Sequence, residues 1–245
     1  MNDTVHTRHR RYSICGSLII VLIPLVFLST SVRIEMNSPS LYTRGFEMYG
    51  VSETTGLDEE QLDEIVTGLI DYFNSRVETP QMQVTSTDGR KFALYHDYEL
   101  IHLEDVKGLF DLNSLVQSFS LLAVVFVTAL ALSRSRQLAV LLSLRSGAVF
   151  ALGGLILGAV LFTLDFGEMF VGFHLLLFDN PFWQLDPRTD YLVMLFPFHF
   201  WQDMFMLAGG MTAAFCMVTL GISHFGLRRP VDAPTNRNPA ESPDV

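Results

Sequence analysis

The chain has 245 residues, of which 49% are hydrophobic and only 17% are charged. Because soluble domains carry about 25% charged residues, this composition indicates an integral membrane protein. The net charge of −10 argues against a nucleic-acid-binding protein, which needs a basic surface.

Four apolar runs approach the roughly 20 residues that a helix needs to cross a bilayer. After a basic leader at residues 1–13, the predicted spans cover 14–32, 114–132, 147–164 and 204–227. The first run could instead be a cleaved signal peptide, but Leu28 to Val32 makes a poor cleavage site, so an uncleaved helix is favoured. The short apolar piece 138–144 is either an interfacial helix or an extension of the third span.

The two cysteines, Cys15 and Cys216, both lie inside apolar runs. They cannot form the disulfide framework of a secreted domain or a metal quartet, so we expect small buried thiols.

Basic residues predict how the chain crosses the membrane. Arginines lie in the leader, in the loop 133–146 and in the tail 228–245, which we expect to be disordered. The regions 33–113 and 165–203 are instead rich in Asp and Glu. Both termini are therefore expected in the cytoplasm, and the two acidic regions share the extracytoplasmic face.

The first outer region, 33–113, shows local patterns of helix and strand. Residues 57–73 place apolar side chains at helical spacing, on one face formed by Leu62, Ile65, Val66, Leu69, Ile70 and Phe73. Thr87-Asp88-Gly89 is typical of a hairpin turn, and a further helix is expected from about Ile101. The predicted fold is mainly α, a four-transmembrane-helix bundle with a small α+β extracytoplasmic domain.

The densest group of ionisable residues surrounds His102, just before the second span. On a helix, His102 and Asp105 share a face, and Glu99 lies three residues earlier. A carboxylate beside a histidine can fix its tautomer and raise its basicity. Lys107 completes the group. The same spacing also occurs on ordinary charged surface helices, so this motif by itself is weak.

A second histidine, His174, lies among apolar residues of the third loop, 165–203. A buried polar side chain needs a partner, and the topology places His174 on the same side of the membrane as His102. Two histidines with nearby carboxylates could perform acid–base chemistry or bind a metal. Trp183 is interpreted as an interfacial anchor and Asp186 as a turn former.

The sequence contains no G-x-S-x-G, H-E-x-x-H or phosphate-binding glycine motif. A serine hydrolase is therefore disfavoured, no resident cofactor is expected, and no cysteine nucleophile is predicted on the outer face.

Two motifs together resemble a known family. The first is E-x-x-H-x-x-D-V-K, from Glu99 to Lys107. The second combines F-H-x-x-x-F at 173–178, N-x-x-W-x-L-D-P at 180–187, and then Asp190 and Pro197. The chain resembles, from its first span to about residue 227, the four-span family of bacterial lipoprotein intramolecular transacylases. It departs from the pattern after Pro197, where an acidic residue is expected and Phe198 and His199 follow.

The resemblance implies an acyltransferase in the bacterial plasma membrane that acts on diacylglyceryl-modified lipoproteins. The sn-2 acyl chain would move to the cysteine α-amine, giving a lyso-form lipoprotein without an acyl-enzyme. The family's two histidines correspond to His102 and His174. We expect His102 as general base, supported by Glu99 or Asp105, with His174 polarising the ester or relaying the proton.

Two other interpretations remain open. The His/carboxylate cluster could bind a metal or a lipid headgroup in a non-catalytic membrane protein, or it could serve a metal-dependent outer-face hydrolase.

Overall fold

The computed structural model describes residues 14–228. The predicted leader 1–13, and the predicted tail 228–245 apart from Arg228, lie outside the described residues. The described elements, in chain order, are α1 (Ile14–Met36), α2 (Pro39–Met48), α3 (Val51–Thr55), α4 (Glu59–Phe73), β1 (Gln83–Thr85), β2 (Lys91–Ala93), α5 (Asp97–Ser133), α6 (Gln137–Leu164), α7 (Phe166–Leu177), α8 (Tyr191–Leu195) and α9 (Phe198–Arg228).

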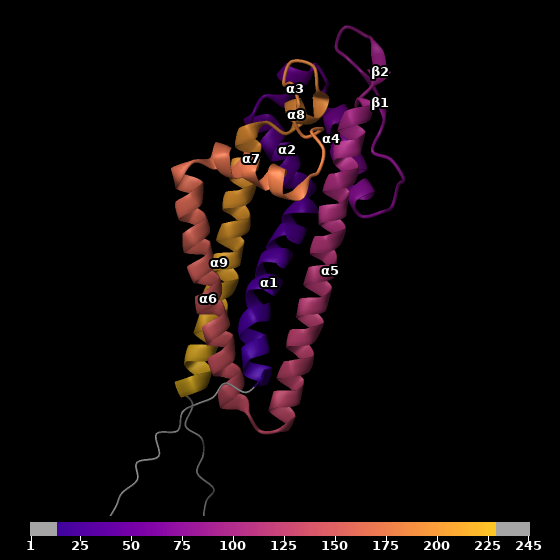
Figure 1. Ribbon diagram of the computed structural model, residues 1–245. Coiled ribbons are helices and arrows are strands. Elements are labelled where there is room, and N and C mark those ends of the chain that lie inside the picture. The colour runs from indigo at the N-terminus through magenta and orange to yellow at the C-terminus, as the bar shows by residue number, and fades with distance from the viewer. Residues whose placement is uncertain (1–13, 229–245) are drawn as a thin grey trace, which may run out of the picture.

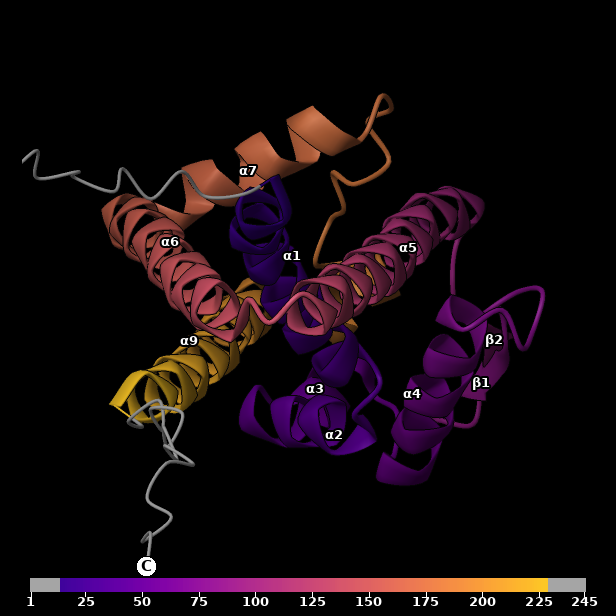
Figure 2. The same ribbon diagram turned by 90° about the horizontal axis from the view of Figure 1, so that it is seen from below.

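Four helices, α1, α5, α6 and α9, are long and apolar enough to cross a membrane. They run along one bundle, with a cap of shorter elements at one end and the α5–α6 connection at the other (Figure 1). Helix α1 lies centrally and packs against the other three (Figure 2). Large apolar side chains point outward along the bundle, among them Leu122, Phe126 and Leu161. The predicted four-helix membrane fold is confirmed.

One glycine of α6 allows close contact with α1, and three others of the same helix do not. Gly153, Gly154 and Gly158 of the third span face open space, because an added Cβ would meet nothing within 4 Å. At Gly147 an added Cβ would lie 3.0 Å from the Cβ of Ile23 and 3.3 Å from the Ile20 carbonyl oxygen. Close approach of α6 to α1 therefore depends on Gly147.

Helix α5 continues from the cap through the bundle as one piece of 37 residues. At 1.5 Å per residue it is about 55 Å long, well beyond the roughly 30 Å of a bilayer core. It begins at Asp97, several residues earlier than the sequence suggested, because the Glu99 carboxylate caps the His96 backbone N–H at 2.8 Å. His102 therefore lies in the second turn, outside the predicted span 114–132.

The short apolar piece 138–144 is the first part of α6 and extends the predicted third span at its N-terminal end. At Asp165 the chain turns into α7, whose first turn is capped by the Asp165 carboxylate. Helix α7 lies across the bundle near the cap (Figure 1), and its last turn carries His174.

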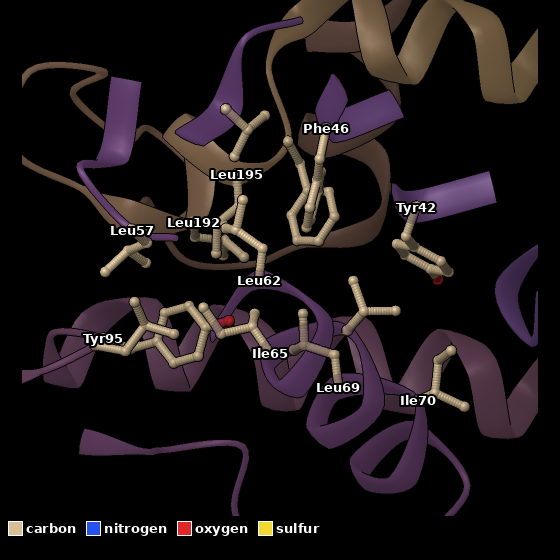
Figure 3. Close-up of a cluster of buried hydrophobic side chains, with 14 of the residues drawn as sticks. Tyr42, Phe46, Leu57, Leu62, Ile65, Leu69, Ile70, Tyr95, Leu192 and Leu195 are labelled. Carbon is tan, nitrogen blue, oxygen red and sulfur yellow. The ribbon is translucent and has the colours of Figure 1, made fainter. Parts of the chain in front are cut away.

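The cap combines both acidic loops. Helix α4 buries the apolar face predicted for it, and Asp58 caps its N-terminus through the Gln61 N–H at 2.9 Å. The predicted hairpin is present as antiparallel β1–β2, with Val84 opposite Phe92. Leu192 and Leu195 of α8, from the third loop, pack with α2 and α4 in one apolar core (Figure 3). The two loops therefore form one folded unit above the membrane helices.

Candidate active site

A cavity of about 990 Å³ lies under the cap. Helices α1, α5, α7 and α9 and the segment 178–188 line it, and it extends toward the bilayer as far as Val32, Asn113 and Ala208. Most lining side chains are aliphatic or aromatic, with few polar groups among them. Its size suits a ligand with long apolar parts.

His102 reaches this cavity from the second turn of α5. Its side chain is buried, and the ring meets the Phe178 ring edge-on at 5.0 Å between centroids. Among the described residues, Nδ1 has no hydrogen-bond partner. Burial lowers the pKa of His102 to about 4, with a further lowering from His174 and a smaller opposing effect from Asp105. His102 is therefore neutral at physiological pH.

His174 comes to the same cavity from the last turn of α7. Its Nδ1 lies 2.7 Å from the Phe170 carbonyl oxygen. A carbonyl oxygen can only accept, so Nδ1 carries the proton and Nε2 holds the lone pair of the neutral ring. The Trp183 ring lies 4.9 Å away. Burial lowers the pKa of His174, and the bond to Phe170 partly opposes this.

The topology predicted His102 and His174 on one side of the membrane, and in the structure their imidazoles lie next to each other in one cavity. Their ring centroids are 6.0 Å apart and the planes are inclined by 32°. A proton on one ring disfavours a proton on the other, because both lie in apolar surroundings. The arrangement offers two neutral acid–base groups close enough to act on one substrate.

The Glu99 carboxylate is engaged with backbone groups. Oε2 accepts from His96 N–H at 2.8 Å, and Oε1 accepts from Leu192 N–H at 2.7 Å. Glu99 is fully buried, which raises its pKa, while the two backbone bonds oppose the shift. The residue thus ties the beginning of α5 to α8 and supports the His102 helix from the cap side.

Asp105 is one turn beyond His102, and its carboxylate accepts a 2.7 Å hydrogen bond from the Asn180 amide. The side-chain oxygen of Asn180, Oδ1, in turn accepts a hydrogen bond from Phe182 N–H at 3.1 Å. This pair anchors the segment that follows α7, including Trp183, against α5.

Asp186 lies on the rim of the cavity and pairs with Arg188 at 2.6 Å. The Arg188 guanidinium lowers the pKa of Asp186 to about 2. The Asp186 backbone N–H donates to Asp190 at 2.7 Å, and Asp190 also accepts from the Tyr98 hydroxyl at 2.6 Å. Asp186, the predicted turn former, thus holds Asp190, and Asp190 fixes the third loop to Tyr98 of α5.

Lys107 lies apart from the two histidines. Its ammonium contacts the Ser75 hydroxyl and lies 3.6 Å from the Asp111 carboxylate and 5.6 Å from the centre of the Tyr72 ring. His199 is also outside the cavity, hydrogen-bonded through Nδ1 to Gln202.

Sequence reasoning overlooked Glu35, which lines the cavity from the end of α1. The available signal was an acidic residue placed immediately after an apolar span.

Within residues 14–228, no three His, Cys, Asp or Glu side chains lie close enough together to hold a metal ion.

Comparisons with known proteins give a family match and a fold match. The family model described as lipoprotein intramolecular transacylase Lit matches residues 17–201. The solved structure of the membrane integral lipoprotein intramolecular transacylase Lit from Bacillus cereus superimposes with a TM-score of 0.73 at 16% identity, covering 87% of this chain and 94% of that chain. A form of that protein with one histidine substituted gives a TM-score of 0.70 at 16% identity, over 87% and 90% of the two chains. At this identity the structural likeness concerns the fold. No curated protein sequence gives a significant match.

Proposed function

Because the chain belongs to the lipoprotein intramolecular transacylase family, we propose that it moves the sn-2 acyl chain of a diacylglyceryl-cysteine lipoprotein to the cysteine α-amine. The product is a lyso-form lipoprotein. The protein is a multi-pass membrane enzyme of the transferase class. The observation that carries the proposed chemistry is the pair of neutral imidazoles, 6.0 Å apart, in a large apolar cavity.

The proposed reaction forms one bond and breaks another on the same substrate. The α-amine nitrogen attacks the sn-2 ester carbonyl carbon, a C–N bond forms, and the C–O bond to glycerol breaks. The amine loses a proton and the glycerol oxygen gains one. Holding donor and acceptor in one cavity converts their encounter into an intramolecular step.

The lining of the cavity supports direct transfer. Among the described residues that line it there is no Ser, Thr, Cys or Lys side chain that could carry the acyl group. The substrate's own amine therefore serves as the nucleophile, and the protein supplies acid–base groups and orientation.

The hydrogen bond at His174 Nδ1 favours this residue as the base, in place of His102. Donation to the Phe170 carbonyl leaves Nε2 free to accept the amine proton and increases its basicity. His174 then passes this proton to one ring nitrogen of neutral His102. His102 donates the proton of its other ring nitrogen to the leaving glycerol oxygen. Glu99, Asp105, Trp183 and Asp186 hold the elements that present the two rings.

We propose that the reaction takes place at the outer face of the membrane, with both termini inside. The acidic cap lies at one end of the bundle and the α5–α6 connection at the other (Figure 1). Arg134 and Arg136 belong to that connection, and Arg145 lies in the first half of α6. This distribution agrees with the rule that arginines stay on the cytoplasmic side.

To test this function, the protein is expressed in a host that makes only diacylated lipoproteins. Mass spectrometry of one lipoprotein N-terminus is expected to show an acyl group on nitrogen and one fewer on glycerol. His102→Ala and His174→Ala are each expected to reduce this product at least about a hundredfold. His199→Ala, a histidine outside the cavity, is the matched control.

An unmodified lipoprotein with the wild-type protein would contradict the proposed function. It would favour a non-catalytic membrane protein whose cavity binds a lipid headgroup or a metal, which binding measurements on the purified protein would then detect.

A further inference from the structure

Glu35 is a buried acid that the proposed acyl transfer does not use. It lies at the cap end of α1, its side chain is 1% exposed, and it lines the same cavity as the two histidines. Its Oε1 has no hydrogen-bond partner among the described residues. An unsatisfied carboxyl oxygen in an apolar site costs stability, so the site suits a ligand that supplies the missing hydrogen-bond partner.

The polar groups around Glu35 are engaged elsewhere. Arg33, two residues earlier, donates to Gln117 at 2.8 Å. The Tyr42 hydroxyl donates to the Met36 carbonyl oxygen at 3.2 Å. The Asn113 amide donates to the Ser29 carbonyl oxygen at 3.1 Å. None of these donors satisfies the Glu35 carboxyl.

The charges that line the cavity point to the sign of the ligand group. Asp186 and Arg188 neutralise each other at the rim, and both histidines are neutral because burial lowers their pKa values. Glu35 is thus the lining acid without a basic partner among the described residues. Burial also disfavours the charged form of this carboxyl, so this part of the cavity suits a basic group that can share a proton with it.

We propose that Glu35 binds the α-amino group of the substrate's N-terminal cysteine and places it beside the sn-2 ester. This inference rests on the proposed function, in which the substrate carries one free amine next to two uncharged acyl chains. The amine and the Glu35 carboxyl share one proton, which stays on the carboxyl when the neutral amine attacks the ester. Glu35 is accordingly a substrate-binding residue, and the histidines complete the proton transfers.

The experiment separates binding from turnover. A dialkylglyceryl-cysteine lipopeptide with ether-linked chains cannot transfer an acyl group, and it is prepared with a free or an N-acetylated amine. Affinities for both forms are measured with the purified full chain in detergent, for the wild type, Glu35→Gln and the control Glu47→Gln. Glu47 is an exposed acid on α2, outside the cavity.

The wild type and Glu47→Gln are expected to bind the free amine about tenfold more tightly than the acetylated form. Glu35→Gln is expected to bind both forms equally, with unchanged affinity for the acetylated one. A free-amine preference that survives in Glu35→Gln overturns the inference.

A second variant guards against misfolding. Glu35→Asp keeps the carboxyl and withdraws it by one methylene, so the preference is expected to shrink while the thermal transition is retained. A preference equal to that of the wild type would also overturn the inference. Failure of the wild type to transfer an acyl chain from the ester substrate would instead contradict the proposed function, independently of these affinities.

Discussion

The Asp105 carboxylate accepts a 2.7 Å hydrogen bond from the Asn180 amide. This contact joins the helix that carries His102 to the segment that follows His174. His102 and His174 lie on two helices, α5 and α7, that are far apart in the sequence. Contacts between these helices and their neighbouring segments therefore determine how the two imidazoles are placed. Their separation of 6.0 Å is therefore sensitive to groups that touch neither ring.

Replacing Asn180 by Asp is expected to separate α5 from the third loop. Two carboxylates would then face each other, and a hydrogen bond to a charged group, contributing about 1.5–3 kcal/mol, would be lost. We expect acyl transfer to fall about tenfold. The rate is measured by mass spectrometry of a lipopeptide substrate, with Asp179→Asn, an exposed neighbour, as the control. Unchanged transfer would show that the cross-link does not hold the site.

Burial of His102 predicts a dependence of stability on pH. The pKa is about 4 in the folded protein and about 6.5 in the unfolded chain, so the unfolded chain binds more protons between these values. Stability is therefore lost as the pH falls from 6.5 toward 4. Between pH 6.5 and 5 this residue accounts for about 1.6 kcal/mol.

The measurement is the thermal transition in detergent at the two pH values. His102→Gln, which cannot take up the proton, is expected to lose less stability than the wild type over this range. An equal loss in both proteins would mean that the His102 ring is not held neutral by burial.

The Trp183 ring is expected to hold His174 in its orientation, because the two rings lie 4.9 Å apart. Trp183→Leu should lower kcat by up to about tenfold, since aromatic pairs contribute about 0.5–1.5 kcal/mol. Trp183→Phe keeps an aromatic face and should lose less. Phe182→Leu, an adjacent aromatic residue outside the cavity, serves as the comparison. Equal effects at both positions would point to general loosening of the loop.

Glu99 is expected to act on folding. The Glu99 carboxylate accepts hydrogen bonds from His96 N–H and Leu192 N–H. In Glu99→Gln the side-chain NH₂ would face one of these two N–H groups, so one hydrogen bond would be lost. We expect a loss of about 1.5–3 kcal/mol in unfolding free energy. The thermal transition measures this, with Glu104→Gln, an exposed acid on the same helix, as control. A stable Glu99→Gln protein without acyl transfer would instead assign Glu99 to the chemistry.

Much of the architecture could be predicted from local patterns. The apolar spans, the amphipathic face of α4 and the β1–β2 hairpin all follow from hydrophobic periodicity and turn residues, and the structure contains each of them. Helix α7 was not predicted as a separate element, because its composition continues that of the third span. Only the break at Asp165, which caps the new helix, distinguishes the two.

The sequence by itself determined the membrane class, the placement of both acidic loops on one side, and the two histidines as candidates. These properties depend on composition and local spacing, which act without knowledge of distant contacts. The tertiary structure decided which groups share the cavity: it brings His102, His174 and Glu35 together and turns Lys107 toward α4 and Glu99 toward backbone donors. Side-chain direction and burial depend on packing between elements far apart in the chain, and that packing exists only in the folded protein.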